Sequence, residues 1–263
     1  MLKKRVVGVV TIRNGWAVQS FGYRQYLPLG KPECLVENLD RWGADEILVQ
    51  VIDRSATNLG PDFELLERLG GLGLETPLIY AGGIRSESDG VKAIQLGADR
   101  IAIDTLLHDD LSSVRRLSVR LGAQALIASM PLSWQGGAIE WLNYRQRIPT
   151  STSISLEILN IIESGVISEV LVTDWMHEGK PGGFDQNIVS KFPLQDVPLI
   201  AFGGLNTAEQ MAILLQQSNV SAIAVGNFLS YKEHAIQKFK ELLADMPLRL
   251  AIYESKWSLL ADV

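Results

Sequence analysis

The chain has 263 residues, with 24 Lys and Arg against 30 Asp and Glu, so its formal net charge is −6. The acidic balance and the lack of a Lys/Arg tract exclude a nucleic-acid partner. A single cysteine excludes a disulfide framework and a multi-cysteine metal site. No apolar run approaches the ~18 residues of a membrane span, so we expect no membrane partner and a cytoplasmic location.

Eight short segments rich in Val, Ile and Leu recur along the chain. Their near-continuous apolarity predicts parallel strands that are buried on both faces. The segments are Arg5–Ile12, Glu46–Ile52, Pro77–Tyr80, Arg100–Ile103, Ala125–Ser129, Glu169–Val172, Pro198–Ala201 and Ala222–Val225.

Between these segments, apolar residues at steps of three and four predict amphipathic helices. The helical patterns are Cys34–Trp42, Phe63–Leu69, Ser86–Leu96, Leu111–Leu121, Leu156–Ser164, Gln186–Phe192, Thr207–Gln216 and Ala235–Ala244. Strict alternation of strand and helix predicts a single (β/α)8 TIM barrel over 1–263, ahead of a doubly wound sheet, which usually has fewer strands.

The two halves of the sequence resemble each other. Pro77–Ile84 matches Pro198–Leu205, Glu46–Val49 matches Glu169–Val172, and Arg100–Ile103 matches Ala222–Val225, at offsets of 121, 123 and 122 residues. Three matches in one order predict two homologous half-barrels, about 1–122 and 123–245, followed by a tail at 246–263.

Glycine pairs follow one strand in each half, and glycine lets backbone N–H groups approach a phosphate closely. We therefore expect a phosphorylated small molecule at the carboxyl ends of the strands, although tight turns would explain the glycines too. The candidate phosphate or substrate residues are Gly82, Gly83, Asp104, Thr105, Gly179, Lys180, Gly203, Gly204, Gly226 and Asn227. The carboxylate of Asp104 would repel a phosphate, so the first-half site is the one expected to be lost or repurposed.

Several motifs together resemble the HisF family, the cyclase subunit of imidazole glycerol phosphate synthase, over almost the whole chain. The motifs are Met1–Val7, Gly43–Ile47, Ala81–Arg85, Gly97–Ile101 and Gly179–Asp185. The resemblance implies a barrel that receives ammonia from a HisH-like glutaminase at its bottom face. The ammonia then crosses the barrel axis to a bis-phosphorylated ribonucleotide, which the family lyses and cyclises.

The two catalytic aspartates of that family are replaced. The resemblance places the first at Thr11 and the second near Met130–Pro131, and none of these side chains can transfer protons near neutral pH. The family also carries a lysine soon after the first strand, and this sequence has Gln19 in its place. Asp174, at the end of the sixth strand, is the candidate replacement acid, although it could equally cap a loop; Asp53 and Asp104 have the same two interpretations.

Four charged residues stand at the starts of strands: Arg5, Glu46, Arg100 and Glu169. Strand starts converge at the bottom of a barrel, and buried charges need partners, so these residues predict a salt-bridged ring. The resemblance implies that the ring is the gate of the ammonia channel, with Arg100 in place of a lysine. A plug that only stabilises the barrel is the alternative.

An ammonia gate without catalytic acids favours an ammonia-relay subunit. Gly15–Ser20 and Gly30–Cys34 resemble a divergent HisF-like branch that works with a sugar amidotransferase in surface-polysaccharide synthesis. One alternative is a true cyclase with relocated acids; another is a phosphate-sugar isomerase, which relies on two similar aspartates. We expect no cofactor and no metal, because His108, His177 and His234 lack metal-ligand spacing.

Three smaller features complete the predictions. Trp134 and Trp141 flank Gly136-Gly137 in an alternating run, which predicts a β-hairpin after the fifth strand. Cys34 opens a helical pattern and is expected in the core. The segment Trp257–Leu260 is expected to form a docking helix or a capping turn.

Overall fold

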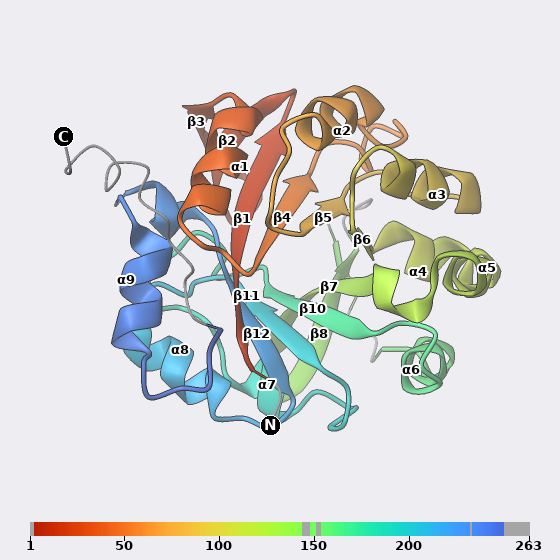
Figure 1. The fold of residues 1–263 in the computed structure, drawn as a ribbon. Helices are drawn as coiled ribbons and strands as arrows, with labels where there is room; N and C mark the ends of the chain where they lie inside the picture. The colour runs from red at the N-terminus through yellow and green to blue at the C-terminus, as the bar shows by residue number, and fades with distance from the viewer. Residues whose placement is uncertain (1–2, 144–147, 151–153, 232, 250–263) are drawn as a thin grey trace.

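The computed structural model describes residues 3–143, 148–150, 154–231 and 233–249. Eight parallel strands close into a barrel in the order β12-β1-β4-β5-β6-β7-β10-β11, and β11 pairs with β12. The strands are β1 (Arg5–Arg13), β4 (Glu46–Val51), β5 (Leu78–Ala81), β6 (Arg100–Ile103), β7 (Leu126–Gln135), β10 (Glu169–Asp174), β11 (Leu199–Phe202) and β12 (Val220–Val225). The predicted (β/α)8 barrel is confirmed, and Figure 1 shows its helices around the strands.

Helices follow the strands on the outside of the barrel. They are α1 (Pro32–Arg41), α2 (Phe63–Gly70), α3 (Glu87–Gln95), α4 (Thr105–Asp109), α5 (Leu111–Leu121), α6 (Leu156–Glu163), α7 (Asn187–Ser190), α8 (Ala208–Leu215) and α9 (Ala235–Leu242), with 3-10 turns η1 (Ala123–Ala125) and η2 (Asn227–Ser230). The side chains of the N-cap residues of α2, α3, α6 and α8 each accept a hydrogen bond from a backbone N–H in the first turn of the helix. These residues are Asp62, Ser86, Ser155 and Thr207. The sequence did not predict α4.

Alternate residues of each strand face the barrel axis, because side chains of a strand point to opposite faces. The inward residues form their own apolar cluster, which includes Val7, Leu48, Ile79, Ala102 and Leu171. The outward residues join the helices in a larger core. The barrel is therefore filled by side chains and has a bottom and a top, and the top is the end at which the strands finish.

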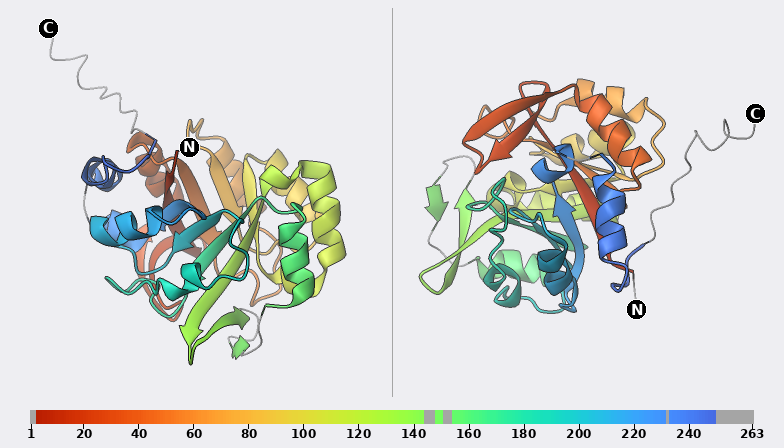
Figure 2. Two further views of the ribbon diagram at one scale, coloured as in Figure 1. Left: turned by 90° about the horizontal axis from the view of Figure 1, so that it is seen from below. Right: turned by 90° about the vertical axis from the view of Figure 1, so that its left-hand side faces the viewer.

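Two hairpins extend from the top end of the barrel (Figure 2). The first is β2 (Trp16–Phe21) with β3 (Gln25–Gly30), and β2 pairs antiparallel with the end of β1. The second is the end of β7 with β8 (Ala138–Asn143), and β9 (Ile148–Thr150) pairs with β8. The second hairpin was predicted. The first was not, because Pro28 and several polar residues interrupt its alternation.

The expectation for Cys34 is wrong, and the expectation for the C-terminal segment falls on residues that the structure does not describe. Cys34 is exposed on α1, not in the core, because it lies on the outer face of that helix. Trp257–Leu260 lies outside the described residues. The half-barrel duplication stays a prediction. Across the described residues, no helix is long and apolar enough to cross a membrane.

Candidate functional site

The bottom of the barrel is closed by four charged side chains. Arg5 contacts Glu46 at 2.7 Å and also pairs with Glu169. Arg100 contacts Glu46 at 3.0 Å and Glu169 at 2.7 Å. Each side chain is only 7–12% exposed. The structure thus brings the four predicted residues into a closed ring of alternating charge, which we call the bottom ring.

Neutral partners hold the bottom ring in place. The hydroxyl of Ser221 donates to Glu169 at 2.8 Å. Arg100 donates to the hydroxyl of Ser168 and to the carbonyl of Gln124, both at 2.9 Å. Burial alone would raise the pKa of Glu169, but Arg5 and Arg100 outweigh burial and lower it. The ring is therefore ionised and almost fully hydrogen-bonded, as a buried charge network must be.

At the top, the first cavity lies over the ends of β4, β5, β6 and β7. Its volume is about 90 Å³, against about 50 Å³ for a second cavity at this end. Its walls include the turn between β2 and β3, Trp175 after β10 and Leu142 on β8. The predicted residues Gly82, Gly83, Asp104 and Thr105 all line it. Residues far apart in sequence thus share one pocket.

Asp104 is the most unusual polar group of the first cavity. Its Oδ1 is buried and accepts no hydrogen bond from any described residue. Burial raises the pKa of Asp104 well above its usual range, and Asp109 adds to the rise. The ring of His108 on α4 lies 3.7 Å from Oδ1, but burial lowers the pKa of His108, which favours its neutral form.

The glycine pair of the first cavity is required by packing. Gly82 has φ +145°, and a Cβ there would lie 2.6 Å from the carbonyl oxygen of Val51. Gly83 has φ +70°, and its Cβ would lie 2.8 Å from the backbone of Gly60. The close approach of two loops thus accounts for these glycines without a ligand. Phosphate binding here stays a prediction.

The second cavity, about 50 Å³, lies over β10, β11 and β12. The predicted residues Gly179, Lys180, Gly203, Gly204, Gly226 and Asn227 all line it. Lys180 is an exposed residue of this lining. The amide of Asn227 is already used, because it donates to the carbonyl of Ser20 at 2.6 Å and accepts from its N–H at 3.1 Å. The second cavity remains the better candidate for a phosphate.

Asp174 does not line either cavity. Its side chain is 1% exposed and accepts from the N–H of Asp185 at 2.8 Å and from the ring of His177 at 2.7 Å. Burial raises its pKa, and these hydrogen bonds oppose the rise. The carboxyl group therefore holds the loop after β10, which is the capping interpretation of this residue. A role as a replacement acid stays untested.

The positions that the resemblance assigns to the catalytic aspartates are Thr11 and the end of β7 near Met130 and Pro131. Thr11 is buried and pairs in register with Gln50 on β4. Met130 packs in the outer core under the helices, and Pro131 pairs with Thr173. Ser129 is the β7 residue that reaches the first cavity. Proton transfer at this end would thus need a different group.

Glu178 is a functional candidate that the sequence did not single out. It is buried, accepts from the hydroxyl of Ser20 at 2.9 Å and from the N–H of Tyr23 at 3.2 Å, and lines the second cavity. It therefore ties the first hairpin to the loop after β10. Gln50 and Ser129 were missed as well, and only the inward alternation of β4 and β7 could have indicated them.

The Glu178 carboxyl predicts a pH effect on stability. Burial raises its pKa in the folded protein, so the folded state binds its proton more tightly than the unfolded chain does. Its contribution to stability must therefore fall as the pH rises from near 4.5 toward neutrality. We expect Glu178→Gln, which keeps an oxygen acceptor, to remove this part of the pH dependence. Denaturant unfolding of both proteins at several pH values in this range measures their free energies of unfolding. The same dependence on pH in both proteins would contradict the assignment.

Among the described residues, no group of three His, Cys, Asp or Glu side chains could hold a metal ion. The chemistry available at the top is that of the carboxyl groups of Asp104, Asp174 and Glu178, with hydroxyls and amides. The bottom offers a closed ionic ring and nothing reactive.

Comparison with known proteins matches this architecture. A family model described as histidine biosynthesis protein matches residues 5–235. The imidazole glycerol phosphate synthase subunits HisF of Staphylococcus carnosus and Thermococcus gammatolerans are 26% and 27% identical, over 93% and 95% of this chain and 97% and 99% of their own. A Vibrio vulnificus protein that carries the name hisF2 is 24% identical over 96% of this chain and 92% of its own. The chain therefore belongs to the histidine biosynthesis protein family, as a member of its HisF group.

Proposed function

We propose that this protein is the synthase-type subunit of a glutamine amidotransferase complex, which accepts ammonia from a HisH-like glutaminase and passes it through the barrel. The observation that carries the proposal is the closed bottom ring below an interior without catalytic aspartates. Relatives are named as subunits of imidazole glycerol phosphate synthase, which supports a partner subunit. The complex would work in the cytoplasm.

The final acceptor of the ammonia is proposed to be a sugar, transformed by a separate sugar amidotransferase in surface-polysaccharide synthesis. The support is the replacement of acids by Thr11 and Pro131, which leaves the barrel without the proton transfer that a cyclase needs. The resemblance of Gly15–Ser20 to the divergent branch adds to it.

A second candidate is the cyclase itself, favoured by the names of the relatives. Steady-state turnover of the bis-phosphorylated ribonucleotide with ammonium salt separates the two. We expect no product at high enzyme concentration. Imidazole glycerol phosphate formation that depends on Asp104 or Asp174 would favour the cyclase and contradict the relay.

The relay is tested with a HisH-type glutaminase. We expect the chain to bind the glutaminase and to stimulate glutamine hydrolysis, and we expect Arg100→Ala to lower that stimulation by about tenfold, within the range of couplings between sites. The reason is that Arg100 contacts both carboxylates of the ring and the bottom-face groups Ser168 and Gln124.

Arg68→Ala is the matched control, because the ion pair that Arg68 forms among the described residues is with Glu33 on the surface of the barrel. It should stimulate the glutaminase as the unaltered chain does. A thermal melt of each variant first establishes that it is folded. If the folded chain neither binds the glutaminase nor changes its rate, the relay function is excluded.

A further inference from the structure

The two cavities at the top lie on either side of one wall. Among the residues that the structure describes, none lines both cavities. The wall is built from the turn between β2 and β3 and from the loop after β10. Gly22 and Tyr23 of the turn and Trp175 of the loop line the first cavity, and Glu178, further along the same loop, lines the second. The wall therefore joins two segments that are far apart in the sequence.

An aromatic contact forms the side of the wall toward the first cavity. Tyr23 and Trp175 pack with Leu142 of β8 in an apolar cluster separate from the barrel core, and each is 6–7% exposed. The hydroxyl of Tyr23 donates to Oε1 of Gln50 on β4 at 3.4 Å. Tyr23 has φ +53°, a left-handed conformation that bulky residues rarely adopt and that persists only where surrounding contacts determine it. The fold thus holds a strained turn that places an aromatic ring against Trp175.

Hydrogen bonds form the side of the wall toward the second cavity. Oε2 of Glu178 accepts from the hydroxyl of Ser20 at 2.9 Å and from the N–H of Tyr23 at 3.2 Å. The backbone carbonyl of Glu178 accepts from the N–H of Gly22 at 2.9 Å. A Cβ at Gly179 would overlap the carbonyl oxygen of Ser20, so the turn and the loop are in direct backbone contact. The wall is therefore closed, and the carboxyl oxygen Oε2 is taken by the hairpin.

The size of the separated cavities limits what each can hold. Their volumes are about 90 and 50 Å³, below the roughly 300 Å³ at which pockets for drug-sized ligands begin. One glycine pair, Gly82-Gly83, lines the first cavity, and the other, Gly203-Gly204, lines the second. A ligand with a phosphate at each end would have to cross the wall to reach both pairs. The carboxyl group of Asp104 also opposes an anion in the first cavity.

We propose that Tyr23, Trp175 and Glu178 form a partition that limits this chain to one small anion, bound in the second cavity, and excludes an elongated ligand with a phosphate at each end. Contact at two linked sites multiplies affinity, and the gain is lost entirely where geometry prevents simultaneous contact. The partition determines specificity by preventing that contact. It is independent of ammonia transfer through the bottom ring, but it rests on the anion site predicted for the second cavity.

Isothermal titration calorimetry of the full chain with inorganic phosphate and with the bis-phosphorylated ribonucleotide tests the partition. We expect the two dissociation constants of the unaltered chain to agree within about threefold, because only one phosphate of the ribonucleotide is seated. Tyr23→Gly removes the ring and suits the left-handed backbone, so it should tighten ribonucleotide binding about tenfold and leave phosphate binding unchanged. Trp175→Ala opens the same wall from the loop after β10 and should act in the same direction.

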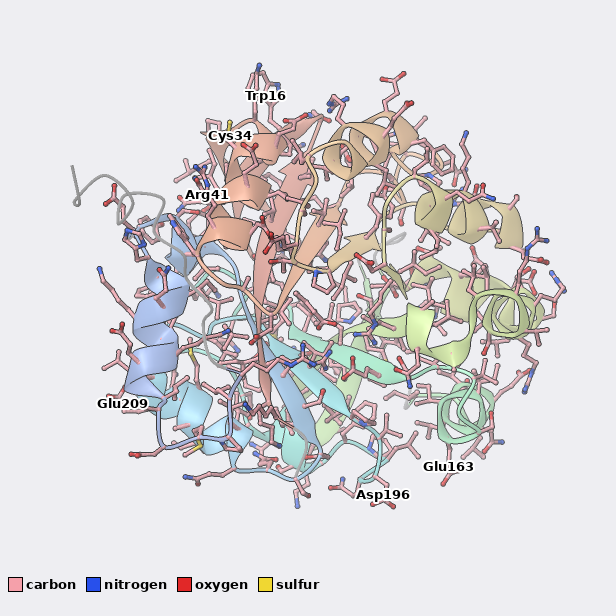
Figure 3. All side chains as sticks on the ribbon, viewed as in Figure 1. Trp16, Cys34, Arg41, Glu163, Asp196 and Glu209 are labelled. Atoms are coloured by element: carbon pink, nitrogen blue, oxygen red, sulfur yellow. The ribbon has the colours of Figure 1, made fainter. Side chains whose placement is uncertain are left out.

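Two control variants separate the partition from a general effect on the hairpin. Tyr23→Phe keeps the ring and should retain the affinity ratio of the unaltered chain. Trp16→Ala removes an aromatic side chain from the same hairpin, but Trp16 is 55% exposed at the outer edge of the molecule (Figure 3), so the ratio should not change. A thermal melt first establishes that each variant is folded.

The partition is overturned if the unaltered chain binds the ribonucleotide roughly 100-fold more tightly than phosphate, the gain expected for two linked sites. It is also overturned if both wall variants keep the ratio of the unaltered chain. No phosphate binding at all would overturn the anion site in the second cavity, and the proposal with it. A confirmed partition without glutaminase stimulation would contradict only the relay. Stimulation together with tight ribonucleotide binding would contradict only the partition.

Discussion

Glu46→Ala is expected to lower the free energy of unfolding by about 3–5 kcal/mol. The substitution removes a carboxylate that contacts both Arg5 and Arg100, and it leaves two buried guanidinium groups to share Glu169. The cost comes from the unpaired buried charges, because neither guanidinium can lose its proton near neutral pH. Urea unfolding measured by circular dichroism gives the value.

Glu33→Ala is the matched control for the bottom ring. It removes one carboxylate from a pair with Arg68 at 2.7 Å, on the exposed faces of α1 and α2. Exposed pairs contribute about 0–1 kcal/mol, so this variant should remain close to the unaltered chain. A similar loss in both variants would show that the ring is solvated and does not close the barrel.

Gly203→Ala is expected to lower the free energy of unfolding by about 3–5 kcal/mol, from backbone strain and overpacking together. Gly203 has φ +105°, and a Cβ would lie 2.5 Å from the carbonyl oxygen of Asp174. Relief would require the loop after β10 to move, and that loop is held by Asp174 and Glu178. The second cavity should be distorted as well.

Gly15→Ala separates the two causes. Gly15 has φ +76°, and its Cβ would meet nothing within 4 Å, so only the left-handed backbone costs energy, about 1–2 kcal/mol. Thermal and denaturant unfolding of both variants give the difference. Equal losses of unfolding free energy in the two variants would mean that the loops over β10 and β11 separate freely. That result would contradict the close packing around Gly203.

The charge pattern of the strand starts illustrates what could be predicted without a structure. A barrel topology brings strand starts together whatever the loops do, so Arg5, Glu46, Arg100 and Glu169 had to lie near one another once the barrel was assigned. The same argument placed Gly82 and Asp104 at one end, and both line the first cavity. Topology was sufficient because these residues lie on the strands or directly at their ends.

Contacts made by loops could not be predicted in this way. Asn227 lines the second cavity, as expected of a residue at the end of β12, but its pairing with Ser20 involves a hairpin that the sequence did not indicate. Asp174 had two interpretations, a replacement acid or a loop cap, and the contact that makes it a cap, with the N–H of Asp185, is seen only in the folded loop. In both cases a short polar side chain found backbone partners that only the folded loops bring within reach.

By itself, the sequence determined the alternation of strands and helices, the barrel, the charged strand starts and the absence of acids at Thr11 and Pro131. These follow from local periodicity and residue type, which need no knowledge of distant contacts. Only the tertiary structure decided that the ring closes, that the glycine pairs are required by loop packing, and that Asp104 and Ser129 share a cavity. Those facts depend on register and on loop contacts between residues far apart in the chain, and a sequence pattern does not specify them.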